Sequence, residues 1–285
     1  YACVRMGLIP VPVYPPSSHG FTAALYKMNF IAQDCRAAAV LTDRSYFWSL
    51  KLHRARTKIA TFSLKRDYTS RLEWIVTDDA EPFGSTSFPE AHSDILFLQY
   101  TSGSTNDPKG VMVSHRNILS NCDAVVDHTP VGVSWLPQYH DMGLIAFYMF
   151  TAIKGGTTYG CSPMDFLHRP ALWLEAMSRY RATASAAPNF AYAYCLRRDK
   201  VADENLQGLD LSALRLLLNG AEPVKAEVYR EFLRRYEPYG LKAGSLSAAY
   251  GLAEYTLAVS GHGREVVSID ALCQFMGVGT MLLEK

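Results

Sequence analysis

A loop rich in glycine, serine and threonine spans residues 100–110, with the sequence YTSGSTNDPKG. It presents hydroxyl groups, closely approachable backbone N–H groups and a lysine, which together suit the oxygens of a polyphosphate. The apolar runs at 95–99 and 111–114 predict a strand on each side, whereas a Walker P-loop leads into a helix. A plain Ser/Thr linker is the alternative, and the flanking strands make it the weaker one. The predicted phosphate ligands are Thr101, Ser102, Gly103, Ser104, Thr105 and Lys109.

Three later segments also contain side chains that could bind a phosphate, a metal ion or a base. They are SWLPQYHDMGLI at 134–145, NGAEPV at 219–224 and YGLAE at 250–254. A carboxylate that attacks a phosphate must approach another anion, so neutralising and positioning groups supply much of the catalysis. His140 suits this task as a hydrogen-bond donor to either anion. A satisfied core histidine beside Asp141 is the alternative.

The other two segments also allow two interpretations each. Glu254 offers a hard oxygen ligand for Mg²⁺, or it is a solvated loop acid. Tyr250 stacks on a base, or its ring packs in the core, because both contacts use the same ring face. Glu222 lies in a candidate binding segment, or it favours the positive end of the helix that follows.

The four segments, in this order, resemble the signature motifs of the adenylate-forming superfamily, which holds acyl-CoA synthetases, luciferases and nonribosomal-peptide adenylation domains. The resemblance implies that His140 sits beside the carboxylate and the α-phosphate, that Tyr250 stacks on adenine, and that Glu254 helps to hold Mg²⁺. Thr105 is a further candidate Mg²⁺ ligand. The implied catalytic residues are Lys109, His140 and Glu254. The implied nucleotide-binding residues, besides the loop, are Asn219, Gly220, Ala221, Glu222, Tyr250, Gly251, Leu252 and Ala253.

The narrower resemblance is to a fatty acyl-AMP ligase, and it covers residues 2–260. Ala253 stands where the superfamily usually has threonine, and alanine is usual in this group. The resemblance implies ATP-dependent activation of a fatty acid to acyl-AMP with release of pyrophosphate. It also implies Mg²⁺ and transfer to the phosphopantetheine thiol of an acyl carrier protein, or of a carrier domain in a polyketide or nonribosomal peptide synthase. A fatty acyl-CoA synthetase and a catalytically incompetent fragment that binds nucleotide or acyl-adenylate are the alternatives.

The composition argues against several classes of protein. The 285 residues carry a net charge of +1, which gives no argument for a nucleic-acid or membrane-surface partner. The longest apolar stretch, 144–153, is too short for a transmembrane segment and predicts a buried helix or strand. None of the six cysteines forms a CxxC pair, so we expect reduced thiols and a cytoplasmic protein.

Helical patterns alternate with short apolar runs, which predicts βαβ units, a largely parallel sheet and an α/β fold of stacked mixed sheets flanked by helices. The arginines of the predicted helix 226–236, Arg235 among them, are expected largely off its apolar side. The residues GLIPVPVYPP at 7–16 predict a buried strand that runs into a proline-rich turn. The other predicted strands are 37–42, 74–77, 95–101, 132–136, 183–187 and 214–218, and the other helices are 23–35 and 169–180.

The chain ends suggest a piece of a larger enzyme. Residue 1 is not methionine, and no segment resembles the ribose-binding aspartate motif or the small domain that carries the adenylation lysine. We therefore expect residues 1–285 to be an incomplete large N-terminal domain, with the small C-terminal domain absent from this chain. The apolar segments 144–153 and 189–195 are candidate walls of an acyl tunnel, and plain core is the alternative for both.

Overall fold

The computed structural model describes residues 1–15, 21–60, 68–80, 93–101 and 107–261. The chain divides into two compact units, residues 1–112 and 113–285. No helix among the described residues is long and apolar enough to cross a bilayer. The α/β fold of the prediction is confirmed.

The first unit holds two short pairs of strands: β1 runs parallel to β2, and β3 pairs with β4. Its buried core is formed by Phe21, Leu25 and Leu50, with Tyr46 and Trp74 packed against it. The elements are α1 (Ala2–Arg5), α2 (Phe21–Asp34), β1 (Ala39–Thr42), α3 (Arg44–Ala60), η1 (Tyr68–Arg71), β2 (Glu73–Val76), η2 (Thr77–Asp79), β3 (Ile95–Tyr100) and β4 (Gly110–Ser114).

The prediction of a buried strand at 7–16 is wrong. Residues 7–15 form neither helix nor strand, and Leu8 is 56 % exposed. The prolines at 10, 12 and 15 lack the N–H that a strand ladder needs, so the apolar pattern cannot be paired from both sides. This segment still lies beside β3, where the Leu98 amide donates a backbone hydrogen bond to the Pro10 carbonyl at 3.1 Å.

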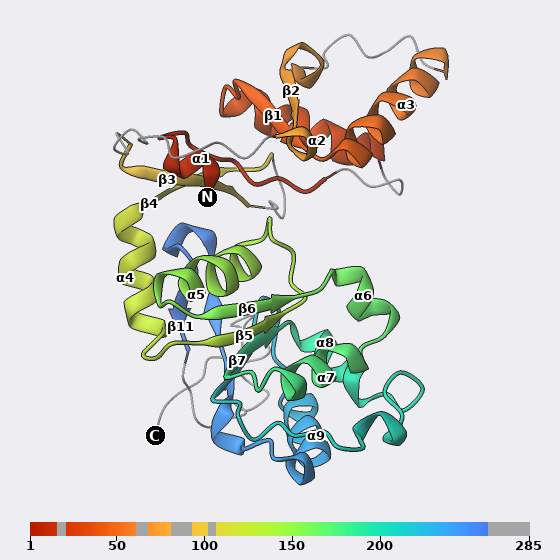
Figure 1. Cartoon of the computed structure of the whole chain (residues 1–285), viewed down its shortest axis with the longest axis vertical. Helices are drawn as coiled ribbons and strands as arrows, with labels where there is room; N and C mark the ends of the chain where they lie inside the picture. Colours follow the sequence, from red (N-terminus) through yellow and green to blue (C-terminus); the bar gives the residue numbers. More distant parts are fainter. Residues whose placement is uncertain (16–20, 61–67, 81–92, 102–106, 262–285) are drawn as a thin grey trace, which may run out of the picture. The chain divides into compact units, whose positions relative to one another are not determined.

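The second unit is built on one five-stranded sheet with the order β6-β5-β7-β8-β9, in which every neighbouring pair is parallel (Figure 1). Parallel strands present all their carboxyl ends at one edge of a sheet. The strands are β5 (Val131–Ser134), β6 (Thr157–Gly160), β7 (Ala184–Ala187), β8 (Leu216–Asn219), β9 (Leu246–Ala248), β10 (Tyr250–Gly251) and β11 (Ala258–Ser260). The helices are α4 (His115–Val125), η3 (Met142–Met149), α5 (Phe150–Ile153), α6 (Pro163–His168), α7 (Ala171–Arg179), α8 (Asn189–Leu196), η4 (Asp203–Leu206), α9 (Ala226–Tyr236), η5 (Glu237–Tyr239), η6 (Ala243–Ser245) and η7 (Ala253–Tyr255).

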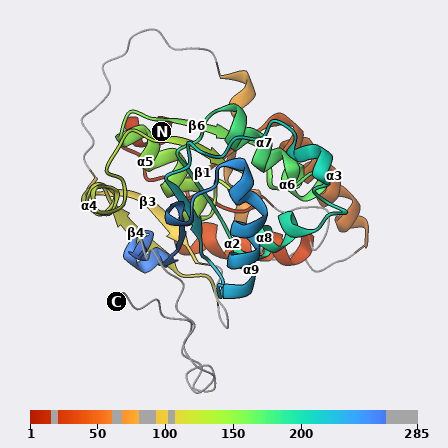
Figure 2. The same cartoon turned by 90° about the horizontal axis from the view of Figure 1, so that it is seen from below.

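Helices contact the sheet from both sides. The apolar run 144–153 forms the end of the π-helix η3 and α5, and the Phe147 ring lies so close to Gly132 of β5 that a Cβ there would approach it to 3.1 Å. From α7, Trp173 donates through Nε1 to Ser185 of β7 at 2.8 Å. Helices α8 and α9 lie side by side (Figures 1 and 2).

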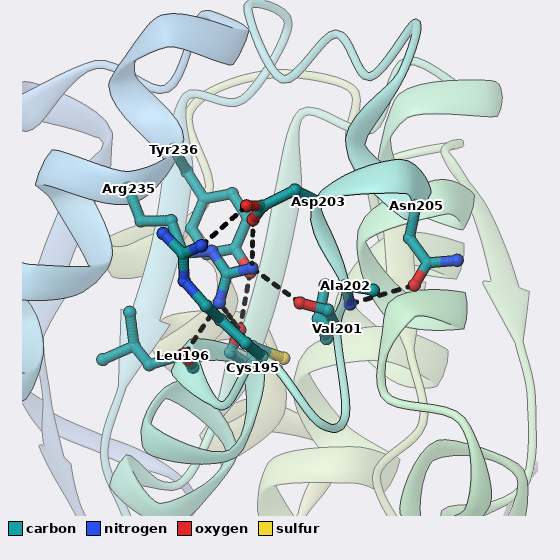
Figure 3. A network of polar contacts seen from close by, with 9 residues as sticks. Cys195, Leu196, Val201, Ala202, Asp203, Asn205, Arg235 and Tyr236 are labelled. Carbon is teal, nitrogen blue, oxygen red and sulfur yellow. Dashed lines mark hydrogen bonds and ion pairs between the residues drawn. The ribbon is translucent and has the colours of Figure 1, made fainter.

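Arg235 departs from the predicted helix pattern. Its side chain is only 14 % exposed and runs from α9 to the end of α8, where it donates to the carbonyls of Cys195 (3.2 Å), Leu196 (2.7 Å) and Val201 (2.6 Å) (Figure 3). The Tyr236 hydroxyl donates to the same Cys195 carbonyl at 2.7 Å. The last carbonyls of a helix lack intrahelical donors and carry partial negative charge, so a guanidinium satisfies both needs.

Replacing Arg235 by alanine is expected to lower the free energy of unfolding by at least about 2 kcal/mol, because several charged hydrogen bonds are lost and their acceptors stay largely buried. Urea denaturation monitored by tryptophan fluorescence measures the change. The neighbouring exposed Arg234 is the matched control, since a surface substitution usually changes stability by less than about 0.5 kcal/mol. Equal losses in R234A and R235A would contradict this role.

Candidate functional site

The predicted site segments of the second unit all follow strands of the same sheet. Residue 140 lies after β5, residues 220–222 after β8 and Tyr250 after β9. The connection from β5 leads to β6 on one side, whereas the connection from β7 leads to β8 on the other. Such a reversal at the carboxyl edge is where open α/β sheets bind ligands. The topology therefore gathers these segments at the edge suited to a site.

Phe190, in the first turn of α8, links three of these connections. Its ring makes a T-shaped contact with the ring of Trp135, which follows β5, at a centroid distance of 6.0 Å. Its backbone amide donates to Oε1 of Glu222, which follows β8, at 2.5 Å. The connection after β9 joins them, because the Ala249 amide donates to the Asn219 carbonyl at 2.9 Å. The four carboxyl ends are thus held together by named contacts.

His140 lies on the surface and not in the core. Its side chain is 54 % exposed, and its Nδ1 lies 2.6 Å from Oδ1 of Asp141. The same oxygen accepts from the Met142 amide at 2.6 Å. Because a carboxylate oxygen can only accept, the Nδ1 that faces it carries the proton, and Nε2 is the atom turned away from it. A carboxylate partner favours the charged imidazolium, and the hydrogen bond that the His140 ring donates to Asp141 raises the pKa of His140. The core-histidine alternative is therefore wrong.

This pairing predicts a pH dependence. The pKa of His140 in the folded chain is raised above its unfolded value of about 6.5, so the pairing stabilises the fold fully below about pH 6.5. That contribution is lost as the pH rises through the raised folded pKa. Titration of the His140 ring by NMR should give a midpoint above about 6.5. In D141N the midpoint should fall, and an unchanged midpoint would contradict the pairing.

The segment after β8 is tightly constrained. Asn219 is fully buried, and no donor among the described residues reaches its Oδ1. A Cβ on the buried Gly220 would lie 2.7 Å from the Ala249 carbonyl oxygen, so only glycine fits. Ala221 has φ +67°, in the left-handed region. Glu222 was expected either to line the site or to favour the start of the next helix. Its carboxylate accepts a hydrogen bond from the Phe190 amide in the first turn of the preceding helix, α8, and its place in the binding segment stays a prediction.

Residues 250–254 open a small hairpin in which β10 runs antiparallel to β11. Two hydrogen bonds hold it to α4: Asn121 Nδ2 donates to the Ala258 carbonyl at 2.9 Å, and the Ala258 amide donates to Asn121 Oδ1 at 3.1 Å. Tyr250 is 62 % exposed, so the core-packing alternative for its ring is wrong. The other predicted site residues of the hairpin divide into exposed Gly251 and Glu254, half-buried Leu252 and buried Ala253.

Only the two ends of the glycine-rich loop belong to the described residues, and both lie in the first unit. The Thr101 amide donates to the Lys109 carbonyl at 3.0 Å, which closes the ends of the loop. Lys109 is exposed and makes no ion pair in the part of the chain that the structure describes. Ser102, Gly103, Ser104 and Thr105 lie outside the described residues.

Two residues of this edge escaped the sequence analysis as site residues, Asn189 and Phe190. The segment 189–195 was considered only as a tunnel wall or core. The start of a helix directly after a parallel strand could have indicated Asn189, since such positions face the carboxyl edge of the sheet. Nothing in the local pattern could have shown that Glu222 is the partner of Phe190, because the two residues are 32 apart in sequence.

Comparison with known proteins gives a family. Residues 1–280 match the model of the family described as AMP-binding enzyme. The chain is 38 % identical over 268 residues to the medium-chain-fatty-acid–[acyl-carrier-protein] ligase JamA of Moorena producens, covering 91 % of this chain and 44 % of the relative. It is 40 % identical over 293 residues to the corresponding ligase TtuA of Teredinibacter turnerae, covering 90 % and 45 %.

Among solved structures, the fatty acyl-adenylate ligase from L. pneumophila in complex with acyl adenylate and pyrophosphate superposes with a TM-score of 0.73 at 36 % identity. The match covers 91 % of this chain and 44 % of that one. The chain thus spans less than half the length of these relatives.

Proposed function

Because the chain belongs to the AMP-binding enzyme family, we propose that it serves the ATP-dependent activation of a fatty acid to acyl-AMP, with release of pyrophosphate. The acyl group then passes to the phosphopantetheine thiol of an acyl carrier protein. The observation that carries the proposal is the meeting of His140, the NGAEPV segment and the Tyr250 hairpin at one carboxyl edge, in a chain whose relatives JamA and TtuA are named fatty-acid–[acyl-carrier-protein] ligases.

Each predicted residue has a task in this reaction. Lys109, which has no ion-pair partner among the described residues, brings a positive charge to the polyphosphate, where it offsets the repulsion between the carboxylate and ATP. His140, held by Asp141 through Nδ1, donates from Nε2 in its protonated form to a carboxylate or phosphoryl oxygen. The exposed ring of Tyr250 offers its face to adenine.

Mg²⁺ is part of the proposal together with ATP. Among the described residues no group of three or more His, Cys, Asp or Glu side chains could hold a metal ion. Mg²⁺ in phosphoryl-transfer sites commonly takes one or two carboxylates, with substrate phosphates and waters as its other ligands. The exposed carboxylate of Glu254 fits that donor set. Bound there, the ion would neutralise charge on the phosphates.

One face of the sheet carries a small, largely apolar pocket. It lies within the second unit, and η3, α5 and the strands supply most of its wall, including Ala146, Phe147, Phe150, Gly132, Leu216 and Leu218. The segment 144–153 therefore contributes to this pocket, whereas 189–195 does not line it. Pro130, Ala184 and Leu216 lie at the amino ends of their strands, so this pocket is not at the carboxyl edge, and the fatty acid is proposed from the names of the relatives.

The location and the acceptor complete the proposal. The five cysteines among the described residues are free thiols, which supports the cytoplasm as the compartment. Fatty-acid-dependent exchange of labelled pyrophosphate into ATP tests the adenylation step. A comparison of holo-acyl carrier protein with coenzyme A as acceptor then tests the transfer. Release of acyl-CoA alone would favour the acyl-CoA synthetase alternative.

The sharpest binding test compares two exposed tyrosines of the same hairpin, Tyr250 and Tyr255, which are 62 % and 65 % exposed. Tyr250→Ala should weaken the binding of AMP by about fivefold or more, because an aromatic contact is worth roughly 0.5–1.5 kcal/mol beyond its buried area. It should leave the binding of pyrophosphate unchanged, since pyrophosphate has no ring. Tyr255→Ala should change neither affinity.

Titration calorimetry measures the affinities for AMP and for pyrophosphate in each variant and in the unmodified chain. Equal losses of AMP and pyrophosphate affinity in Y250A would contradict the stacking role. Absence of AMP binding by the unmodified chain would contradict the proposed function as a whole.

A further inference from the structure

The first residue of α8, Asn189, is buried and bonds to both ends of the segment after β8. Its Oδ1 accepts from Asn219 Nδ2 at 3.3 Å and from the Lys225 backbone amide at 3.1 Å. Asn189 is 6 % exposed and Asn219 fully buried. A single oxygen therefore spans residues 219–225, the segment that holds the proposed adenine contacts.

These bonds also decide how the two amides are oriented. A backbone N–H can only donate, so the Lys225 amide requires the oxygen of Asn189 on its side. Asn219 must then present its nitrogen to that oxygen. Its own Oδ1 is left facing away, buried and without a donor among the described residues. The orientation of Asn219 thus depends on Asn189.

Two more contacts join the same parts of the chain. The Phe190 amide donates to Glu222 at 2.5 Å, and the Gly220 amide donates to the Ala187 carbonyl at 3.3 Å. Between them lies Ala221, whose φ of +67° is unfavourable for a residue with a Cβ. An unfavourable backbone conformation persists only where its surroundings hold it. The contacts from residues 187–190 supply that restraint.

The other end of α8 is held separately, by Arg235 and Tyr236 of α9 (Figure 3). Asn189, at the start of the helix, is held by its own hydrogen bonds to Asn219 and to the Lys225 amide. The hydrogen bonds of Arg235 go to Cys195, Leu196, Val201 and Asp203 at the far end of the helix.

We propose that Asn189 is a positioning residue for nucleotide binding: it sets the conformation of residues 219–225 through Asn219 and the Lys225 amide, without touching the ligand. This inference rests on the proposed function, because it assumes that residues 219–222 contact adenine.

The test measures AMP affinity by titration calorimetry and melting temperature, in the full 285-residue chain. Asn189→Ala should weaken AMP binding about tenfold, because both hydrogen bonds that order the segment are lost. Asn189→Asp keeps the acceptor oxygen at the same place and should restore most of the affinity.

Two controls separate positioning from general stability. Arg235→Ala loosens the other end of α8 and should lower the melting temperature while AMP affinity stays within about twofold. Asn205→Ala removes an exposed asparagine whose oxygen accepts from the Ala202 amide, and should leave AMP affinity unchanged.

The outcomes divide cleanly. If N189A binds AMP as tightly as R235A does, or if Asp fails to restore binding that Ala abolishes, the positioning role is overturned while the proposed function stands. If the unmodified chain binds no AMP, the proposed function fails and this inference fails with it.

Discussion

Replacing Trp173 by alanine is expected to lower the free energy of unfolding by about 3–5 kcal/mol, the range for a large aromatic residue removed from a core. Trp173 is 1 % exposed and makes edge contacts with the rings of Trp135 (6.4 Å) and Tyr192 (5.6 Å). Its Nε1 donates to Ser185, whose hydroxyl donates to the Val133 carbonyl at 2.6 Å. The substitution therefore creates a cavity and removes the hydrogen bond through which α7 is joined to β7 and, by Ser185, to β5.

Urea denaturation followed by circular dichroism measures the loss, and the melting temperature should fall by about 2–4 °C for each kcal/mol. Trp48→Ala is the matched control, because this tryptophan is 61 % exposed. Trp173→Phe, which keeps a ring and loses the N–H donor, should fall between the two. A W173A protein no less stable than W48A would contradict the central place of Trp173 in the core.

Replacing Lys109 by alanine is expected to weaken the binding of ATP with Mg²⁺ by about 10- to 100-fold. A hydrogen bond between charged groups contributes about 1.5–3 kcal/mol, and each 1.36 kcal/mol is a factor of ten. Lys109 is exposed, and no ion pair within the described residues occupies it, so its charge is available to a polyphosphate. The melting temperature should hardly change, because an exposed lysine contributes little to the fold.

Titration calorimetry at two salt concentrations measures this effect, and the difference between the two proteins should shrink as salt rises. Lys242→Ala, another exposed lysine, is the control for a general loss of positive charge. Lys109→Arg should keep part of the affinity, since arginine preserves the charge but not the compact ammonium. Unchanged affinity in a folded K109A protein would remove Lys109 from the proposed phosphate site.

Most elements of the fold follow from local patterns. The helix predicted at 226–236 is α9 with the same bounds, and the strand predicted at 183–187 is β7, one residue shorter. Apolar spacing is a property of neighbouring residues, and so a helix or strand that buries one face can be found from it. The failure at 7–16 has a local cause as well, because the four prolines outweigh the apolar alternation there.

The sequence by itself determined the family and the α/β class and predicted most residues of the candidate site, because those motifs are contiguous and each carries its own chemistry. Tertiary structure alone decided which distant groups meet. It turned Arg235 inward to the end of α8, bonded Glu222 to Phe190, and made Asn189 a buried bridge to residue 225. Each of these partners lies more than 30 positions away in the chain, and only the parallel order of the strands, with the helices packed on them, brings them within hydrogen-bond distance.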